Sequence, residues 1–256
     1  MLDAIAHLGR AVLNFIREAG GLFLLLGRIL RFSPRVFKDR DLFFEQAINI
    51  GYNSIPIVIM VGAFTGAVSA WQTNYQIEGY VPLRYLGLAT FKAVVIELGP
   101  VLTALILAGR VGASIAAELG TMRVTEQIDA LESLAINSVR YLAVPRFFAA
   151  LFMMPALVTL ADFTAIAGAW LVALLLLDIP TATFFSEIPK FFRVFDIIAG
   201  LIKAFVFGGI ISLVGCHIGF RTEGGAEGVG RSTIRSFVLS AVLILIADYL
   251  LATIFF

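Results

Sequence analysis

The sequence predicts an all-α integral membrane protein. It is expected to have an N-terminal interfacial amphipathic helix, five transmembrane helices and a short cytoplasmic coupling helix between spans two and three. Hydrophobic residues make up 60% of the chain and charged residues 14%, whereas soluble domains have about 45–50% and about 25%. The mean hydropathy of +0.96 agrees with this class. Because one spanning helix needs about 20 apolar residues, the 256 residues leave room for about five or six spans with short loops.

Charge and cysteine content exclude several functional classes. The chain has 19 basic and 18 acidic residues and a net charge of +1, so it has no global positive field to attract nucleic acid. Cys216 is the single cysteine, which excludes an intramolecular disulfide and a multi-cysteine metal cluster. The two histidines are far apart and no H-E-x-x-H motif occurs, so no metal site is expected. The sequence therefore predicts neither a metal nor a nucleic-acid partner.

Residues 1–45 are expected to form an amphipathic helix region that lies on the membrane surface. The longest apolar run, 19–27, is too short to span a bilayer. Arg28 and Arg31 follow this run directly and no A-x-A cleavage site occurs, so a cleaved signal peptide is the less favoured alternative. Apolar residues recur at helical spacing on one face, as in interfacial helices. This face consists of Leu8, Val12, Phe15, Ile16 and Ala19.

Residues 46–256 are expected to form a single membrane domain with five spans. In the first span, Gly62-x-x-x-Gly66 is a motif for close packing of two helices. In the second span, Pro100 cannot donate a backbone hydrogen bond to the carbonyl of Ile96 and predicts a kink. The spans are expected at about 48–71, 85–117, 147–177, 196–220 and 236–256.

A glycine-rich stretch, 224–230, precedes the last span. It lacks the G-x-G-x-x-G pattern and no strand precedes it, so we interpret it as a tight turn between helices rather than a phosphate-binding loop. Ser232 or Thr233 is expected to cap the helix that follows.

Lys and Arg positions predict an N-terminus in the cytoplasm and a C-terminus on the opposite side. Seven basic residues precede the first span and seven lie in the two other inner segments, against four on the outer side. The inner segments hold Arg110, Arg123, Arg140, Arg146, Arg221, Arg231 and Arg235, and the outer side holds Arg84, Lys92, Lys190 and Arg193.

Four ionisable residues lie inside predicted spans, where charge is costly and usually faces protein or water. At 1.5 Å per residue, Glu97, Lys203 and Asp248 lie at depths of about 18, 10 and 12 Å from the outer side. One cation and two carboxylates are therefore expected to form a buried cluster. Its role is open between a structural pairing that fixes helix register and a polar lining of a substrate cavity. Asp162 has no obvious partner.

The inner segment 118–146 contains a short amphipathic helix. One small apolar edge of this helix is expected to consist of Ile128 and Leu131, extended by Leu134 and Ala135. An acidic face is expected to consist of Glu126, Asp129 and Glu132. Amphipathic helices of this kind dock into grooves of partner proteins, although packing on the membrane surface is the alternative.

Four blocks of this sequence closely resemble the permeases of the MlaE/YrbE family, and the match covers nearly the whole chain. The blocks are E-L-G-P at 97–100, A-G-R-V-G at 108–112, A-E-L-G-T-M-R-V-T-E-Q-I-D-A-L at 117–131 and G-G-A-E-G-V-G at 224–230.

The resemblance implies the membrane subunit of an ABC transporter that moves phospholipids or related lipids between the membranes of diderm bacteria. It implies a homodimer at the centre of the complex, cytosolic ABC ATPase subunits, a periplasmic ring of MCE-domain proteins and, in some systems, a STAS-domain protein. Lipid would occupy a cavity between the two copies, near Glu97, Lys203 and Asp248. A bacterial inner membrane is the expected location, because the N-terminus does not look like a transit peptide.

The resemblance also implies a coupling helix at about 125–134 that transmits ATP hydrolysis from the ATPase, with Glu126 and Asp129 nearest to that partner. The chain itself has no G-x-x-x-x-G-K-[ST] motif and no nucleophile elbow, so no catalytic site and no cofactor are expected. The residues expected to take part in coupling are Arg123, Thr125, Glu126, Gln127, Asp129 and Leu131.

Two other functions remain open on the sequence. A stand-alone secondary transporter or channel for a small amphipathic solute would need an ion-coupling residue near the membrane midplane, and Asp162 is the main candidate. A membrane enzyme acting on lipids would need a catalytic constellation at the interface, which the scarcity of histidine disfavours. An ATPase and an MCE protein encoded next to this chain would favour the permease.

Overall fold

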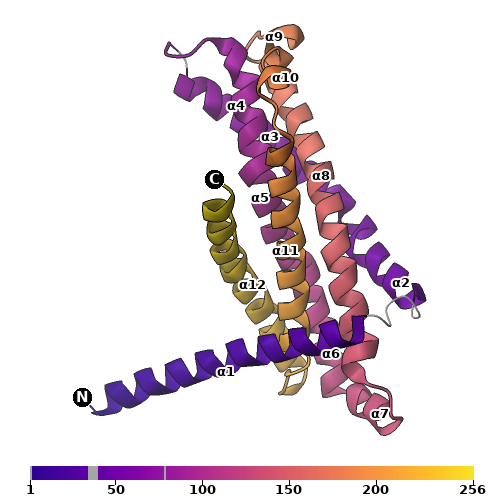
Figure 1. Ribbon diagram of the computed structural model, residues 1–256. Helices are drawn as coiled ribbons and strands as arrows, with labels where there is room; N and C mark the ends of the chain where they lie inside the picture. The colour runs from indigo at the N-terminus through magenta and orange to yellow at the C-terminus, as the bar shows by residue number, and fades with distance from the viewer. Residues whose placement is uncertain (1, 34–39, 78) are drawn as a thin grey trace.

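The computed structural model describes residues 2–33, 40–77 and 79–256, and for 2–12, 14 and 15 it describes the backbone alone. Every regular element in the described ranges is a helix, and five segments are long and apolar enough to cross a membrane. The predicted fold class is therefore confirmed (Figure 1). The five segments are Arg40–Ile77, Leu83–Val124, Val139–Leu175, Val194–Gly219 and Gly225–Phe255.

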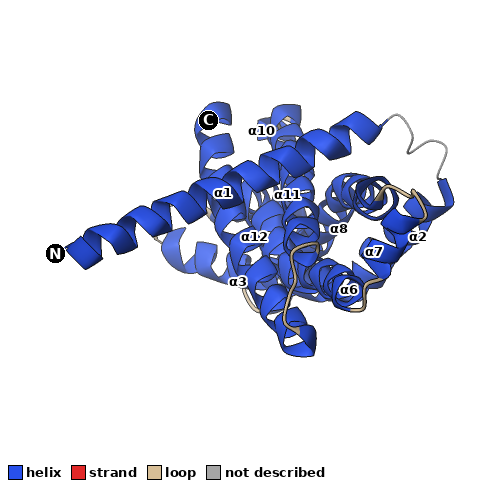
Figure 2. Cartoon of the chain, turned by 90° about the horizontal axis from the view of Figure 1, so that it is seen from below, coloured by secondary structure: helices blue, strands red, loops and turns tan. Residues whose placement is uncertain are grey.

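Helix α1 (Leu2–Phe32) lies across one end of the bundle, roughly perpendicular to the spans (Figures 1 and 2). Leu25 and Ile29 are buried against the bundle, whereas Phe23 and Leu24 are exposed. This placement agrees with a helix on the membrane surface. Of the expected apolar face, Leu8, Val12 and Phe15 have side chains outside the described part, Ile16 is exposed and Ala19 is half-buried.

The first spanning segment, Arg40–Ile77, contains the predicted range 48–71 and has a break in its helix. Helix α2 (Arg40–Ile50) is followed by Gly51 and a short 3₁₀ turn, η2 (Tyr52–Ser54), which leads into α3 (Ile55–Ile77). The sequence did not predict this break, because the run without charges gives no sign of it. The helix also continues past Trp71, since the polar residues that follow remain helical.

Close packing of α3 on α8 (Val144–Leu175) confirms the role expected for the two spaced glycines. A Cβ atom added at Gly66 would lie 1.7 Å from the carbonyl oxygen of Ala165, and one at Gly62 would lie 2.2 Å from Oγ1 of Thr164. Because only hydrogen fits at these positions, the backbones of the two helices approach each other closely.

The second span contains two π-helical turns instead of a simple kink. Helix α4 (Leu86–Ala93) follows the 3₁₀ turn η3 (Leu83–Tyr85), and the π-turn η4 (Val94–Leu98) comes directly before Pro100. A π-turn changes the backbone hydrogen-bond register, and such turns are frequent at functional sites. The remaining elements of this span are α5 (Gly99–Leu107), η5 (Ala108–Gly112) and α6 (Ala113–Val124).

The short elements lie at the two ends of the bundle (Figure 1). Helix α7 (Gln127–Ser133) and the π-turn η6 (Val139–Ala143) lie at the same end as α1, and α7 begins two residues later than the predicted coupling helix. Helices α9 (Thr181–Phe185) and α10 (Ile188–Phe191) lie at the opposite end, before α11 (Val194–Gly219).

The glycine-rich stretch is mostly helical, so its interpretation as a turn was wrong. Helix α12 (Gly225–Phe255) begins inside it, with Gly224 as the N-cap at φ +88°. Gly228 is required for close approach, because a Cβ there would lie 1.8 Å from the carbonyl oxygen of Glu223. Ser232 does not cap the helix but accepts a hydrogen bond from the Thr222 hydroxyl at 2.9 Å. Thr233 instead donates to a carbonyl within α12.

Candidate functional site

Lys203 on α11 is the centre of the buried charge cluster. Its side chain is fully buried, which is costly for an ammonium group unless carboxylates compensate the charge. Small residues on α11 allow neighbouring backbones to come close. At Gly200, for example, an added Cβ would lie 2.4 Å from the carbonyl oxygen of Val95 in η4.

The structure brings together the three residues predicted to form the cluster. Nζ of Lys203 donates a hydrogen bond to Oε2 of Glu97 at 2.5 Å and lies 2.8 Å from Oδ1 of Asp248. The three side chains come from η4, α11 and α12, so the cluster joins three different spans.

The cluster is closed on one side and open on the other. The side chain of Lys203 is 0% exposed and that of Asp248 is 13% exposed, whereas that of Glu97 is 44% exposed. With two carboxylates and one ammonium group the cluster is acidic when all three are ionised. The partly exposed Glu97 can therefore contact a ligand or a second protein chain while Lys203 remains covered.

The π-turn η4 places Glu97 toward α11. On its other side, Asp162 of α8 contacts Gly99, where an added Cβ would lie 1.8 Å from Oδ1 of Asp162. That oxygen is buried and has no hydrogen-bond partner within the described part of the chain. Asp162 therefore lies beside the cluster's helix without an ion pair to Lys203, and its role stays open.

A hollow of about 520 Å³ lies between α3 and the η4–α5 segment. Its lining is amphipathic, since hydroxyl and amide side chains from α3 alternate with apolar ones. Leu98, the neighbour of Glu97, contributes to its wall. The lining residues are Phe64, Thr65, Val68, Ser69, Gln72, Thr73, Gln76, Leu98 and Leu102.

The segment predicted to couple to an ATPase has an inner and an outer face. Ile128 is buried and Leu131 is half-buried against the bundle, while Glu126 and Asp129 are exposed. Leu134 was expected on the apolar edge, but its side chain is 70% exposed, because the helix ends at Ser133 and the chain turns away.

Local contacts hold this segment in place. Arg123 forms an ion pair with Asp129, which joins the end of α6 to α7. The hydroxyl of Thr125 donates to the carbonyl of Thr121 at 2.8 Å and accepts a hydrogen bond from the Gln127 amide at 3.0 Å. Glu126 adopts a left-handed backbone conformation with φ +59°, which produces the sharp corner between the two helices.

A second charge network was not predicted from the sequence. Glu18 of α1 lies 2.7 Å from Nη2 of Arg235, 3.1 Å from Nε2 of His217 and 3.9 Å from Nη1 of Arg221. Partial burial raises the pKa of Glu18, but the hydrogen bond with His217 and the nearby arginine charges outweigh this effect and lower the pKa overall. The network fastens α1 to α11 and α12.

One further ion pair and one further hydrogen bond between spans were also not predicted. Arg146 lies 3.0 Å from Oε2 of Glu118, and Arg110 donates a hydrogen bond of 2.5 Å to the Ser54 hydroxyl. Sequence spacing could not reveal these contacts, because each joins different spans whose relative heights and rotations are set by packing. Within the described ranges no three His, Cys, Asp or Glu residues gather as metal ligands would.

The fold and this cluster define a class: a multi-pass membrane protein whose buried charges lie between spans and whose short amphipathic helix projects at one end. The model of the family "Permease MlaE" matches residues 43–254, so this chain belongs to the MlaE permease family. It is an ABC transporter permease.

Relatives agree with this assignment. The chain is 43% identical over 258 residues to a "Probable ABC transporter permease protein" of Rickettsia bellii, covering 100% of this chain and 99% of that protein. A similarly named protein of Rickettsia prowazekii is 40% identical with the same coverage. The "Intermembrane phospholipid transport system permease protein MlaE" of Haemophilus influenzae is 31% identical over 258 residues, covering 100% of this chain and 98% of that protein.

Proposed function

We propose that this permease moves phospholipids between the inner and outer membranes, as a homodimer powered by ATP hydrolysis on separate subunits. The observation that carries the proposal is the Glu97–Lys203–Asp248 cluster, which is buried at Lys203 and open at Glu97. The next residue along the chain, Leu98, lines the amphipathic hollow. A phospholipid has a charged headgroup and apolar chains, and this arrangement offers surfaces for both.

A second copy of the chain is the proposed neighbour of α12. This helix packs on α11 and α6 on one side, and it has large apolar side chains exposed on the other. In a homodimer these side chains and Glu97 would face a shared cavity. The exposed residues on α12 include Ile234, Val238, Val242, Leu245, Ile246, Tyr249, Leu250 and Ile254.

Helix α7 is the proposed contact for the ATPase. It projects from one end of the bundle, is fastened by Ile128 and Arg123, and exposes Glu126, Asp129 and Leu134. A helix that is rigidly joined to a span can transmit the movement of a cytosolic subunit to the membrane region.

The proposed orientation places α1 and α7 in the cytoplasm of a bacterial inner membrane and α9 and α10 in the periplasm, where MCE-domain proteins would bind. Single cysteines test it, because Cys216 is buried. Ser133→Cys should react with an impermeant reagent only from the cytoplasm, and Asp178→Cys only from the periplasm. Labelling of both from one side would contradict five spans with opposite ends.

Co-purification in mild detergent, followed by mass spectrometry of proteins and lipids, tests the proposed function. The expected result is the chain together with an ATPase, an MCE-domain protein and bound phospholipid, with a STAS-domain protein as a further component where the system has one. Recovery of the chain without bound phospholipid and without an ATPase would contradict the proposal. It would favour a stand-alone transporter, for which Asp162 offers a buried carboxyl oxygen that has no hydrogen-bond partner among the described residues.

A further inference from the structure

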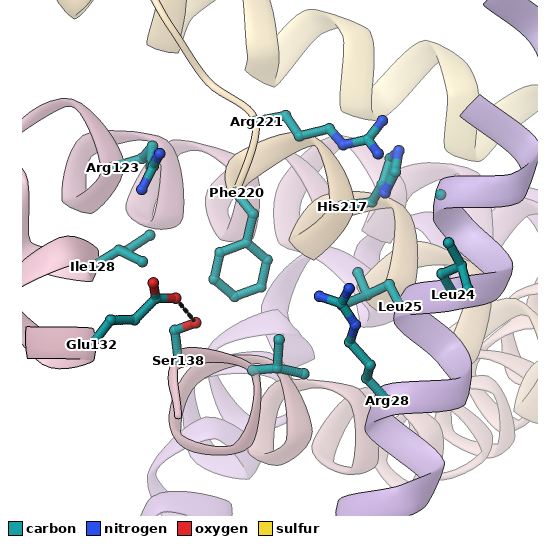
Figure 3. A pocket seen from close by; sticks show the side chains of 12 residues that line it. Leu24, Leu25, Arg28, Arg123, Ile128, Glu132, Ser138, His217, Phe220 and Arg221 are labelled. Atoms are coloured by element: carbon teal, nitrogen blue, oxygen red, sulfur yellow. Dashed lines mark hydrogen bonds between the residues drawn. The ribbon is translucent and has the colours of Figure 1, made fainter. Parts of the chain in front are cut away.

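A pocket of about 230 Å³ lies at the α1 end of the bundle, between α1, the α6–α7 corner and the end of α11 (Figure 3). It is separate from the charge cluster and from the amphipathic hollow, with which it shares no lining residue. The twelve lining residues are Gly21, Leu24, Leu25, Arg28, Arg123, Ile128, Glu132, Ser138, Val139, His217, Phe220 and Arg221.

The charged part of the lining is mainly basic. It includes three guanidinium groups and one carboxylate, that of Glu132, which accepts a hydrogen bond from the Ser138 hydroxyl at 2.7 Å. Arg123 is paired with Asp129. Arg221 lies 3.9 Å from Oε2 of Glu18, an oxygen that is nearer to His217.

Arg28 is the most available cation in this pocket. It extends from α1 toward the ring of Phe220 in Figure 3, and it forms no ion pair with a carboxylate in the described part of the chain. Arginine is well suited to phosphate, because its planar group donates two parallel hydrogen bonds to two oxygens.

The pocket depends on a close approach of α1 to the end of α11. A Cβ at Gly21 would lie 2.6 Å from Nη2 of Arg221 and 2.6 Å from Cε1 of His217. Glycine at this position therefore lets α1 pass directly over these two side chains, which brings Arg28 and Arg221 into one lining.

Apart from His217 and Ser138, the remaining side chains of the lining are apolar, which points to a lipid rather than a free anion. Leu24 is exposed beside Phe23 on α1, while Leu25, Ile128 and Phe220 form the pocket wall. Interfacial helices place apolar side chains at the boundary of headgroups and acyl chains, with arginines beside the phosphates. Small-molecule sites commonly measure about 300–1,000 Å³, so this smaller pocket suits a headgroup whose chains remain in the bilayer.

We propose that this pocket binds the phosphate headgroup of an anionic phospholipid from the adjacent leaflet, through Arg28 and Arg221, next to helix α7. That leaflet is the cytoplasmic one in the orientation proposed above, on which this inference rests. A lipid at this place contacts α1 and the α6–α7 corner together, so it would join the membrane surface to the helix proposed to meet the ATPase.

Native mass spectrometry of the purified full-length chain tests the proposal, with dioleoylphosphatidylglycerol as the probe and dioleoylphosphatidylcholine for comparison. The wild type should bind phosphatidylglycerol more tightly. Arg28→Gln should weaken this binding about tenfold, because a charge-assisted contact to the phosphate is lost. Arg17→Gln is the matched control, since Arg17 is an exposed arginine of the same helix outside the pocket.

A variant that is expected to bind the lipid more tightly distinguishes a specific loss of binding in Arg28→Gln from misfolding. Glu132→Gln keeps an acceptor for Ser138 and removes the negative charge, so binding should become roughly two- to fivefold tighter. Equal binding by the wild type, Arg28→Gln and Arg17→Gln would overturn the proposal. So would displacement of the lipid by an equal concentration of inorganic phosphate, which would show that the anion alone is the ligand.

The same variants distinguish a lipid site from a protein contact. If Arg28→Gln lost the co-purifying ATPase while it kept its phosphatidylglycerol, the pocket would be a docking site for an acidic segment of that partner, and the lipid proposal would fail. If Arg28→Gln bound phosphatidylglycerol more weakly and Glu132→Gln more tightly, but no ATPase co-purified with the wild type, the lipid site would stand and the proposed function would fail.

Discussion

The ammonium group of Lys203 lies between two carboxylates and has no contact with solvent. Loss of one partner from a buried ion pair costs about 3–5 kcal/mol, since the remaining charges stay uncompensated. Lys203→Ala should therefore impair both stability and lipid transport, measured by thermal unfolding and by transfer between vesicles. Lys190→Ala should impair both less, because Lys190 is 62% exposed and its buried partner Glu187 keeps a second cation, Arg84, at 3.9 Å.

A variant without the three charges distinguishes a cluster that only fixes helix register from one that lines a substrate cavity. Lys203→Met combined with Glu97→Gln and Asp248→Asn keeps the approximate volumes and removes all three charges. If the cluster only fixes helix register, this variant should fold and transport lipid. If the cluster lines a substrate cavity, the variant should fold but transport lipid poorly. Equal transport by this variant and the wild type would contradict a role in the cavity.

Glu18 gives a pH-dependent contribution to stability. Because the pKa of Glu18 in the folded state is below the ordinary value of 4.5, its network stabilises the protein above that value, and this contribution is lost as the pH falls through the lowered pKa. Glu18→Gln should lower the free energy of unfolding by about 1 kcal/mol at neutral pH. The groups facing Glu18 are His217, Arg221 and Arg235.

Thermal unfolding of wild type and Glu18→Gln across a pH series measures this contribution. The difference between them should vanish at the acidic end, and Glu45→Gln, which changes an exposed acid on α2, should show no such difference. If the difference in unfolding temperature between the wild type and Glu18→Gln persisted unchanged below the lowered pKa, Glu18 would act through packing and not through charge.

At the residue scale, the sequence predicted the cluster because three rare intramembrane charges were placed at comparable depths. It did not predict which neighbours each would touch. The contact of Asp162 with Gly99 and the network around Glu18 depend on the rotation of helices that are far apart in the chain.

Helix pairs set the geometry in which these residues meet, and α3 packs closely on α8 at Gly62 and Gly66. Gly66→Ala would place a methyl group against the Ala165 carbonyl, with a cost of about 1–3 kcal/mol for overpacking. The purified variant should unfold at a lower temperature than the wild type. Gly20→Ala is the control, because nothing lies within 4 Å of a Cβ there, and an equal effect of both would contradict close packing at Gly66.

Helix α7 carries the prediction for coupling. Glu126→Lys combined with Asp129→Lys reverses two exposed charges and should abolish ATPase co-purification without unfolding the permease. Asp178→Asn changes an exposed acid at the opposite end, where asparagine tolerates the positive φ of 52°, and should leave the association intact. Retained association and transport in the double variant would show that α7 is not the contact.

Element boundaries were predicted less well than element number. The break at Gly51 lies inside an uncharged run, so hydropathy did not separate α2 from α3. The π-turns also leave no mark in composition, and Pro100 indicated only that the helix would be irregular there. At 224–230 the glycines allow the first residues of α12 to pack closely against the preceding chain. Glycine content alone does not distinguish such a helix start from a turn.

For the whole molecule, successive spans run in opposite directions, which places α1 and α7 at one end and α9 and α10 at the other. This arrangement separates the proposed ATPase contact from the proposed periplasmic contacts, with the charge cluster between them. Hydropathy was sufficient to predict the five spans, because it depends on the bilayer and not on details of packing. The orientation that the count of basic residues predicts stays a prediction.

The central claim is that the chain is a passage for phospholipid that moves its cargo only when an ATPase acts on α7. Transfer of fluorescent phospholipid from proteoliposomes, measured for the permease alone and for the permease with its ATPase and ATP, tests this claim most directly. The account predicts transfer only in the presence of both ATPase and ATP. Equal transfer by the permease alone would contradict it.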